Sequence, residues 1–109
     1  MMEPSPPKTG NSIVVYIDRD LEDIVPGFLE NRHKDAATLQ TALAENDMET
    51  VQLLGHRMKG DGAGYGFQKI SELGDWLETA ALRNDLTAIK KHTAALIEFL
   101  SQVEVVFQK

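Results

Sequence analysis

The residues best suited to chemistry in this 109-residue chain are His56, Lys59 and Gly60, which fall within one helical turn. An imidazole can act as a nucleophile or exchange a proton near neutral pH. On a helix, Lys59 would neighbour His56, and its ammonium could neutralise charge on a group held by the ring. Gly60 would lie one turn beyond His56, where a glycine costs about 1 kcal/mol relative to alanine. We interpret this glycine as space for another molecule to approach the imidazole.

The helix that carries these residues is expected to begin after Asp47, a suitable N-cap. Its apolar stripe consists of Val51, Leu54 and Met58. On a helical wheel, His56 falls about 140° from Val51 and Gly60 about 180° from it. His56 is therefore predicted to point away from the core. Leu53 projects from roughly the same outward side, and we expect it to form part of an apolar docking surface around the histidine.

Apolar residues recur at helical spacing in three further segments. The first begins near Asp18 and contains Pro26, where we expect a break, so that a short helix precedes the first long one. The later stripes run through residues 67–81 and 86–107, separated by Asn84 and Asp85. The chain is thus predicted to be all-α, an antiparallel four-helix bundle with an additional short N-terminal helix and a flexible N-terminal arm.

Two domain boundaries follow from composition. Residues 1–12 are rich in Pro, Ser, Thr, Gly and Asn, and we interpret them as a flexible arm or linker. Residues 13–109 are predicted to form a single helical bundle domain. The β-branched run Ile13–Ile17 could be a strand, with residues 103–107 as its one candidate partner, but such a pair would be marginal alone. We interpret the run as an extended segment docked on the domain.

Composition disfavours several classes of function. The net charge is −6 and basic residues are scattered, which argues against nucleic acid as a partner. The longest apolar stretch has five residues, so we expect no membrane insertion, and no secretory signal is visible. There is no cysteine, which excludes disulfides, and the composition points to the cytoplasm. The glycine spacing fits no nucleotide-binding loop.

The three histidines and the single tryptophan give no sign of a metal site or of a stacking platform. His33, His56 and His92 lack the spacing of a helix-borne metal site, so no metal is expected. We interpret His33 and His92 as ordinary polar residues. Trp76 lies beside the apolar stripe of its helix and is predicted to sit at the rim of the core.

The run His56-Arg57-Met58-Lys59-Gly60, with Gly66 ten residues after the histidine, resembles the signature of histidine-containing phosphotransfer (HPt) domains. The resemblance implies that His56 is the phosphorylated residue and that Lys59 neutralises charge on the phosphoryl group. It also implies that Gly60 gives access to the partner and that Gly66 serves a structural turn. We assign Leu53, Gly60 and Gly64 to the partner-binding surface. The pair Leu77-Glu78 resembles the end of the family's next helix, whereas Asp61 and Gly62 stand where small residues such as Ser or Ala are usual.

The resemblance further implies a carrier in a phosphorelay of two-component signal transduction. His56 would accept a phosphoryl group from a receiver-domain aspartate and pass it to another receiver, without autokinase activity. No cofactor is expected in the chain itself, because magnesium would come from the partner receiver. The expected partners are response-regulator receiver domains or a hybrid histidine kinase, and the chain is expected to be a monomer.

Three alternatives remain open at the level of sequence. The chain could be a binding or scaffold module that kept the HPt fold without phosphotransfer. It could also be a fragment of a larger hybrid sensor kinase. A histidine phosphatase or a kinase dimerisation region is a further possibility, but the latter would normally carry an acidic residue after the histidine, where this chain has Arg57.

Overall fold

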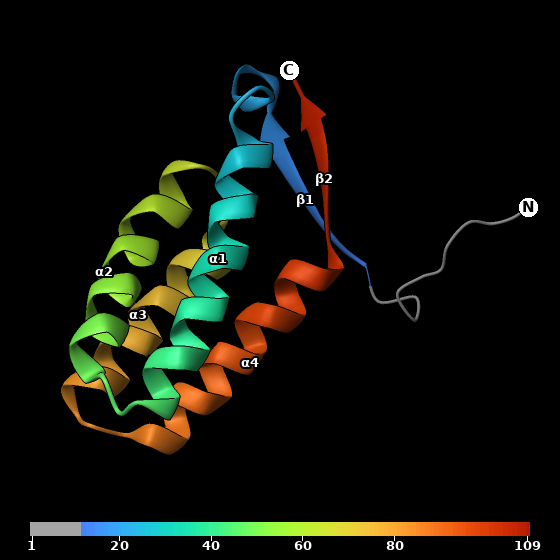
Figure 1. Ribbon diagram of the computed structural model, residues 1–109. Helices are drawn as coiled ribbons and strands as arrows, with labels where there is room; N and C mark the ends of the chain where they lie inside the picture. Colours follow the sequence, from blue (N-terminus) through green and yellow to red (C-terminus); the bar gives the residue numbers. More distant parts are fainter. Residues whose placement is uncertain (1–11) are drawn as a thin grey trace, which may run out of the picture.

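A computed structural model describes residues 12–109 as four long helices and two short strands (Figure 1). In chain order the elements are β1 (Ile13–Asp18), a 3-10 turn (Arg19–Leu21), α1 (Val25–Ala44), α2 (Met48–Gly64), α3 (Gln68–Leu82), α4 (Leu86–Gln102) and β2 (Val103–Gln108). Consecutive helices run in alternating directions, so the predicted antiparallel four-helix bundle is confirmed. The predicted N-terminal arm, apart from Ser12, lies outside the described residues.

Two of the helix–helix turns are built alike, because the same residue types end one helix and begin the next. Asn46 and Asn84 follow α1 and α3 in the left-handed conformation, with φ of 58° and 57°. Asparagine tolerates this region better than most residues. Asp47 and Asp85 then cap α2 and α4, each accepting a hydrogen bond from the backbone N–H three residues later. Local sequence thus explains where these helices begin and end.

The core lies between the four helices, and each helix supplies completely buried side chains. Leu39, Met58, Leu77 and Leu96, one from each helix, have no exposed surface. Burial of one such side chain contributes about 1.5–3 kcal/mol relative to leaving it in water. The helical stripes read from the sequence therefore face this shared core.

The α2–α3 contact is unusually close because glycines line it on both sides. A Cβ atom on Gly55 would lie 2.7 Å from the Glu78 backbone nitrogen and 2.8 Å from the Gly74 carbonyl oxygen. A Cβ on Gly62 would lie 2.5 Å from the Ser71 backbone nitrogen. No larger residue fits at these positions without movement of a backbone. Gly62, which departs from the usual HPt pattern, thus has a packing role here.

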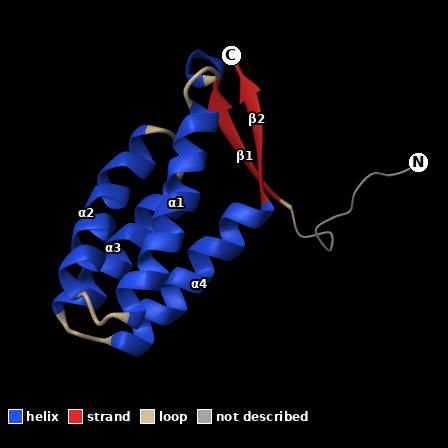
Figure 2. Cartoon of the chain, in the orientation of Figure 1, coloured by secondary structure: helices blue, strands red, loops and turns tan. Residues whose placement is uncertain are grey.

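The two ends of the domain differ from the sequence prediction (Figure 2). The expected short N-terminal helix is only the 3-10 turn Arg19–Leu21, and Pro26 lies in the first turn of α1, where its missing N–H is not needed. Helix α4 ends at Gln102 instead of continuing to Phe107. Residues Val103–Gln108 form β2, since the β-branched side chains in this segment favour extended backbone.

Strands β1 and β2 form a two-stranded parallel sheet. The register is continuous, from Ile13 opposite Val103 to Asp18 opposite Gln108. A parallel pair requires a long crossover connection, and here the whole helical bundle supplies it. The run Ile13–Ile17 is therefore a strand, not merely a docked extended segment. One of its residues, Ile17, is buried and reaches the turn after α2.

Candidate functional site

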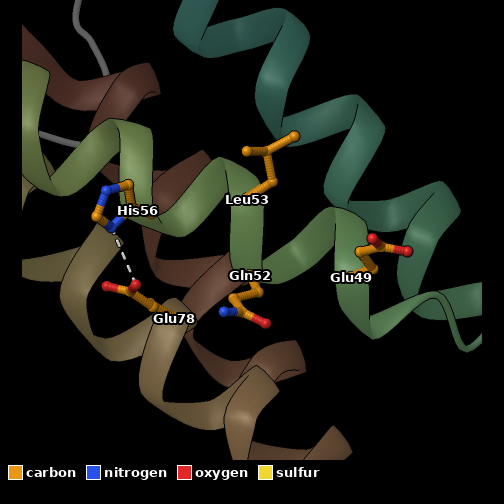
Figure 3. Close-up of a pocket in the computed structure, with 5 residues that line it drawn as sticks. All are labelled: Glu49, Gln52, Leu53, His56 and Glu78. Carbon is orange, nitrogen blue, oxygen red and sulfur yellow. Dashed lines mark hydrogen bonds and ion pairs between the residues drawn. The ribbon is translucent and has the colours of Figure 1, made fainter.

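His56 lies in the middle of α2 with its side chain 69% exposed and with one ring nitrogen bound to α3 (Figure 3). Its Nδ1 atom is 3.0 Å from Oε2 of Glu78, a carboxylate that is mostly covered by its surroundings. The close approach of the two helices at Gly55 and Gly74 brings Glu78 within reach of the histidine. The outward orientation of His56 is as the helical wheel predicted.

The hydrogen bond to Glu78 determines which nitrogen of His56 is available for chemistry. An ionised carboxylate can only accept hydrogen bonds, so Nδ1 carries the hydrogen that it donates to Glu78. In the neutral ring this leaves the lone pair on Nε2. Nε2 has no hydrogen-bond partner within residues 12–109 and is turned away from Glu78 (Figure 3). The arrangement therefore presents an imidazole nucleophile to the surroundings of the protein.

Lys59 places an ammonium beside the same carboxylate. Its Nζ atom is 3.5 Å from Oδ1 of Asp75 and 3.9 Å from Oε1 of Glu78. The Lys59 side chain is half-exposed, so these ion pairs are weak and the ammonium can turn to another anion. The Ser71 hydroxyl donates a 2.6 Å hydrogen bond to the backbone carbonyl of Lys59, which ties this part of α2 to α3.

The residues assigned to partner binding differ in their distance from His56. A Cβ atom on Gly60 would meet no atom of residues 12–109 within 4 Å beyond its own stretch of helix, so the packing of these residues does not require a glycine there. Leu53 is 55% exposed and lines a shallow groove together with His56, Glu78 and two further α2 residues. Gly64 is equally open, but it lies at the end of α2, roughly 12 Å along the helix from His56.

The turn that follows α2 contains Gly66, the residue assigned a structural role. Gly66 has φ of 90°, a conformation that residues with a side chain rarely adopt. A Cβ at this position would also lie 2.7 Å from Cδ1 of Ile17 in β1. Gly66 therefore lets the end of the histidine helix pack against the strand.

The other end of the histidine helix is held by its N-cap. The Thr50 hydroxyl donates a 2.7 Å hydrogen bond to Asp47, and the Thr50 backbone N–H donates a second one. These two bonds, the hydroxyl first, lower the pKa of the Asp47 carboxyl below its ordinary value. The cap therefore stays ionised at neutral pH, and the negative charge suits a helix N-terminus.

Sequence reasoning missed three residues that build the site, Glu78, Asp75 and Gly74. Glu78 was noted only as part of the Leu77-Glu78 pair and received no role. Asp75 and Glu78 lie one turn apart on α3, which is a signal that they share a face. Nothing in the sequence showed that this face meets Lys59 and His56, because the contacts join residues 16 to 22 positions apart.

A second histidine also contacts α3, on its other side. The His92 ring of α4 stacks on Trp76, with ring centroids 5.5 Å apart and an interplanar angle of 14°. Burial lowers the pKa of His92 below its ordinary value, and the charge of Lys91 adds to the effect. Trp76 is 58% exposed, so it covers His92 from outside and is not the core-rim residue that was predicted.

The part of the chain that the structure describes contains no helix long and apolar enough to cross a membrane. Within the same residues, no three His, Asp or Glu side chains are grouped so that they could hold a metal ion.

Comparison with known proteins identifies the family. A family model described as Hpt domain matches residues 23–105, about three quarters of the chain. This range contains all four helices and the His56 site. No curated protein and no solved structure gives a significant match. Members of this family are phosphoryl carriers, not classical enzymes, and they interact with receiver domains and histidine kinases. The chain therefore belongs to the Hpt domain family and is a histidine phosphotransfer module of two-component signalling.

Proposed function

We propose that His56 accepts a phosphoryl group from the aspartate of a receiver domain and passes it to another receiver. The observation that carries this proposal is the exposed imidazole of His56, whose Nδ1 is held 3.0 Å from Glu78. The bond leaves Nε2 free and facing outward, where a partner can reach it. A phosphorelay carrier needs such an arrangement, because it binds no small substrate and must react with a group on another protein.

The transfer that we propose is a displacement at phosphorus. The lone pair of Nε2 attacks the aspartyl phosphate, a nitrogen–phosphorus bond forms, and the bond from phosphorus to the aspartate oxygen breaks. The aspartate carboxylate leaves with the electron pair. The second step is the reverse, with the carboxylate of another receiver as the nucleophile. No proton needs to leave His56 in either direction, since the hydrogen on Nδ1 stays between the ring and Glu78.

Glu78 and Lys59 have complementary parts in this proposal. The imidazole becomes cationic when Nε2 is phosphorylated, and the Glu78 carboxylate offsets that charge through Nδ1. Lys59 exchanges its weak contacts with Asp75 and Glu78 for the phosphoryl oxygens, whose charge it neutralises. Phosphoryl transfer depends mainly on positioning and charge neutralisation, so two correctly placed side chains are a sufficient contribution from the carrier.

The partner supplies the remaining requirements. Magnesium and the acidic pocket that holds it belong to the receiver in this proposal, so the carrier needs no cofactor and has no autokinase activity. Leu53 supplies apolar contact in the groove beside His56, and Gly60 and Gly64 leave open surface along α2. In the part of the chain that the structure describes, no neighbouring element contacts the Gly60 Cβ position, which supports a role outside the bundle for this glycine. We expect the relay to operate in the cytoplasm.

The test is phosphoryl uptake from a labelled receiver. The chain is mixed with a receiver phosphorylated on aspartate in the presence of magnesium, and acid-labile phosphate on the chain is measured. The unsubstituted chain and His92→Gln should take up the label, whereas His56→Gln should take up none. Magnesium-ATP without a receiver should give no label. Labelling of His56→Gln at the normal level would contradict the assignment, and a chain that binds receivers without any uptake would be a scaffold module.

A second arm of the same experiment concerns Lys59. Lys59→Ala removes charge neutralisation but keeps the nucleophile, so we expect uptake to be slower than normal and still detectable. The initial rate of labelling measures this. A loss as complete as in His56→Gln would assign Lys59 a larger role than the proposal gives it.

A further inference from the structure

The β1–β2 sheet is a feature that the Hpt domain match does not explain. The match begins at residue 23 and ends at residue 105, so it excludes all of β1 and the last three residues of β2. Parallel sheets are usually larger and covered on both faces, and a two-stranded sheet is marginal alone. Among residues 12–109, the sheet contains only these two strands, and apart from the Val103 N–H, which donates to the Phe99 carbonyl at the end of α4, neither strand's backbone bonds outside the pair. Each strand therefore has one edge without partners.

The outer face of this sheet is apolar at its centre. Val14 and Tyr16 of β1 and Val106 of β2 are 46%, 63% and 40% exposed, and Tyr16 lies opposite Val106 in the register. Proteins usually protect an open edge with proline, lysine or a bulge. Strand β2 has none of these along its six residues and carries a single charge, Glu104. The edge is suited to pairing with another strand.

The two open edges are not equally accessible. Strand β1 contributes Ile17 to the core, under the turn at Gly66, whereas every residue of β2 is exposed or half-buried. In the upper part of the sheet in Figure 1, β1 lies between β2 and α1, and α2 is on the opposite side of the molecule from β2. A strand that pairs with β2 would therefore leave the His56 site open.

The sequence of β2 is complementary to itself in the antiparallel direction. With Val106 opposite the Val106 of a second copy, Glu104 faces the second copy's Gln108, and Val105 faces its Phe107. No like charges oppose each other, and the carboxylate meets an amide that can donate to it. The outer face then shows a continuous apolar row, Tyr16 and Val106 of one copy followed by Val106 and Tyr16 of the other.

We propose that the occupant of this edge is a second copy of the chain, which pairs antiparallel through β2 about a two-fold axis at Val106. The product is a four-stranded sheet in the order β1-β2-β2-β1, joining two helical bundles. Both copies use the same surface, as a two-fold contact requires. The contact is small, so the dimer should depend on concentration. Each copy keeps its own His56 site, and the inference is independent of the phosphotransfer proposal.

The first test compares charge substitutions on the two strands by sedimentation velocity of the full chain, from micromolar to near-millimolar concentration. The unsubstituted chain should shift from monomer to dimer. Val106→Lys places two ammonium groups opposite each other and should remain monomeric throughout. Val14→Lys is the matched control, since it is exposed on the same face but lies on the strand away from the two-fold axis. It should still dimerise.

Mixing two oppositely charged variants shows whether the loss of the dimer comes from charge repulsion or from a folding defect. Val106→Lys and Val106→Glu should each be monomeric alone and should form a dimer when mixed, because opposite charges then meet at the axis. A chain that stays monomeric at every concentration, as the sequence led us to expect, would overturn the proposal. Equal loss of the dimer in Val14→Lys and Val106→Lys would do the same.

The absence of cysteine from the chain permits a direct test of the register. Residues opposite each other in an antiparallel pair have Cα atoms about 4.5–5.5 Å apart, which suits a disulfide. Val106→Cys should therefore cross-link into a covalent dimer under mild oxidation, and Val14→Cys should not. Failure of Val106→Cys to cross-link faster than Val14→Cys would refute pairing through β2.

Discussion

His56 and His92 both contact α3, yet the two sides of this helix make them very different residues. Their partners, Glu78 and Trp76, are two positions apart, which places them about 200° apart around the helix. On the α2 side, His56 is 69% exposed and donates from Nδ1 to a carboxylate. On the α4 side, the ring of His92 is stacked on an indole, and burial lowers its pKa.

The difference teaches that a histidine's role depends on its partner and its exposure. A carboxylate on one nitrogen orients the ring, stabilises positive charge on it and leaves the other nitrogen for reaction. Stacking and burial instead cover the ring faces and disfavour the charged form. The glycine-lined α2–α3 contact is what allows the first arrangement, since it brings the backbone of α3 close enough for Glu78 to reach His56.

The largest expected effect comes from adding a side chain where the glycines of α2 and α3 pack together. Gly74→Ala introduces a Cβ that would meet the backbone of Gly55 and Lys59, so α3 must move away from α2. We expect the free energy of unfolding to fall by about 1–3 kcal/mol, the usual cost of overpacking. Urea denaturation measures it.

The matched control is Gly60→Ala, on the same pair of helices but with open space around the new methyl group. It should raise stability by about 0.5–1 kcal/mol, because alanine is the better helix former. If Gly74→Ala and Gly60→Ala had the same effect, the close contact could not be what positions Glu78.

The next effect concerns access to His56. Gly60→Leu places a large side chain one turn beyond the histidine without touching the core, so helix content by circular dichroism should be unchanged. We expect transfer from a phosphorylated receiver to slow on the order of tenfold, which corresponds to about 1.4 kcal/mol. Gly60→Ala should transfer at nearly the normal rate. Normal transfer by Gly60→Leu would remove the argument that Gly60 gives close access.

A smaller effect is expected from Glu78→Gln, which makes the partner of His56 neutral while keeping its shape. An amide can present either its oxygen or its N–H to Nδ1, so the preference for one tautomer weakens. Transfer should slow about fivefold, as expected for loss of a charged hydrogen bond at an exposed site worth about 1 kcal/mol. Nitrogen NMR of the imidazole should show a shift in tautomer populations, whereas Asp75→Asn should leave them unchanged. An unchanged tautomer in Glu78→Gln would contradict the proposed role.

The smallest effect belongs to His92 and appears as pH dependence. Because the folded chain holds the pKa of His92 below its ordinary value of 6.5, the unfolded chain binds the proton first as pH falls. The folded state therefore loses some stability as pH falls through 6.5 toward the lowered pKa. His92→Gln should lose less between pH 8 and pH 5, as measured by the urea midpoint at each pH. An equal loss in both proteins would show that His92 titrates as it does in the unfolded chain.

The fluorescence of Trp76, the only tryptophan in the chain, provides a second measurement of His92 protonation. Protonation of the stacked His92 ring should quench its fluorescence, with a midpoint below pH 6.5. No such titration is expected in His92→Gln.

Much of the fold could be predicted because it depends on short-range patterns. Four apolar stripes at helical spacing predicted four helices, and Asp47 and Asp85 marked where two of them begin. The ends of the domain could not be predicted in the same way. Val103 and Phe107 continue the apolar spacing of α4, so a prediction from periodicity alone makes this helix too long. Only the pairing with β1 makes the strand conformation favourable for these residues.

The sequence by itself determined that His56, Lys59 and Gly60 share an outward helical face, because a regular helix converts spacing into direction. It also determined, through Asp47, where that helix begins. Only the tertiary structure decided that Glu78 is the partner of His56 and that Trp76 covers His92. The physical reason is that both contacts join different helices, and for His56 and Glu78 the distance between the helices is set by the glycines that pack at the α2–α3 crossing. That distance is not encoded in the pattern of either helix alone.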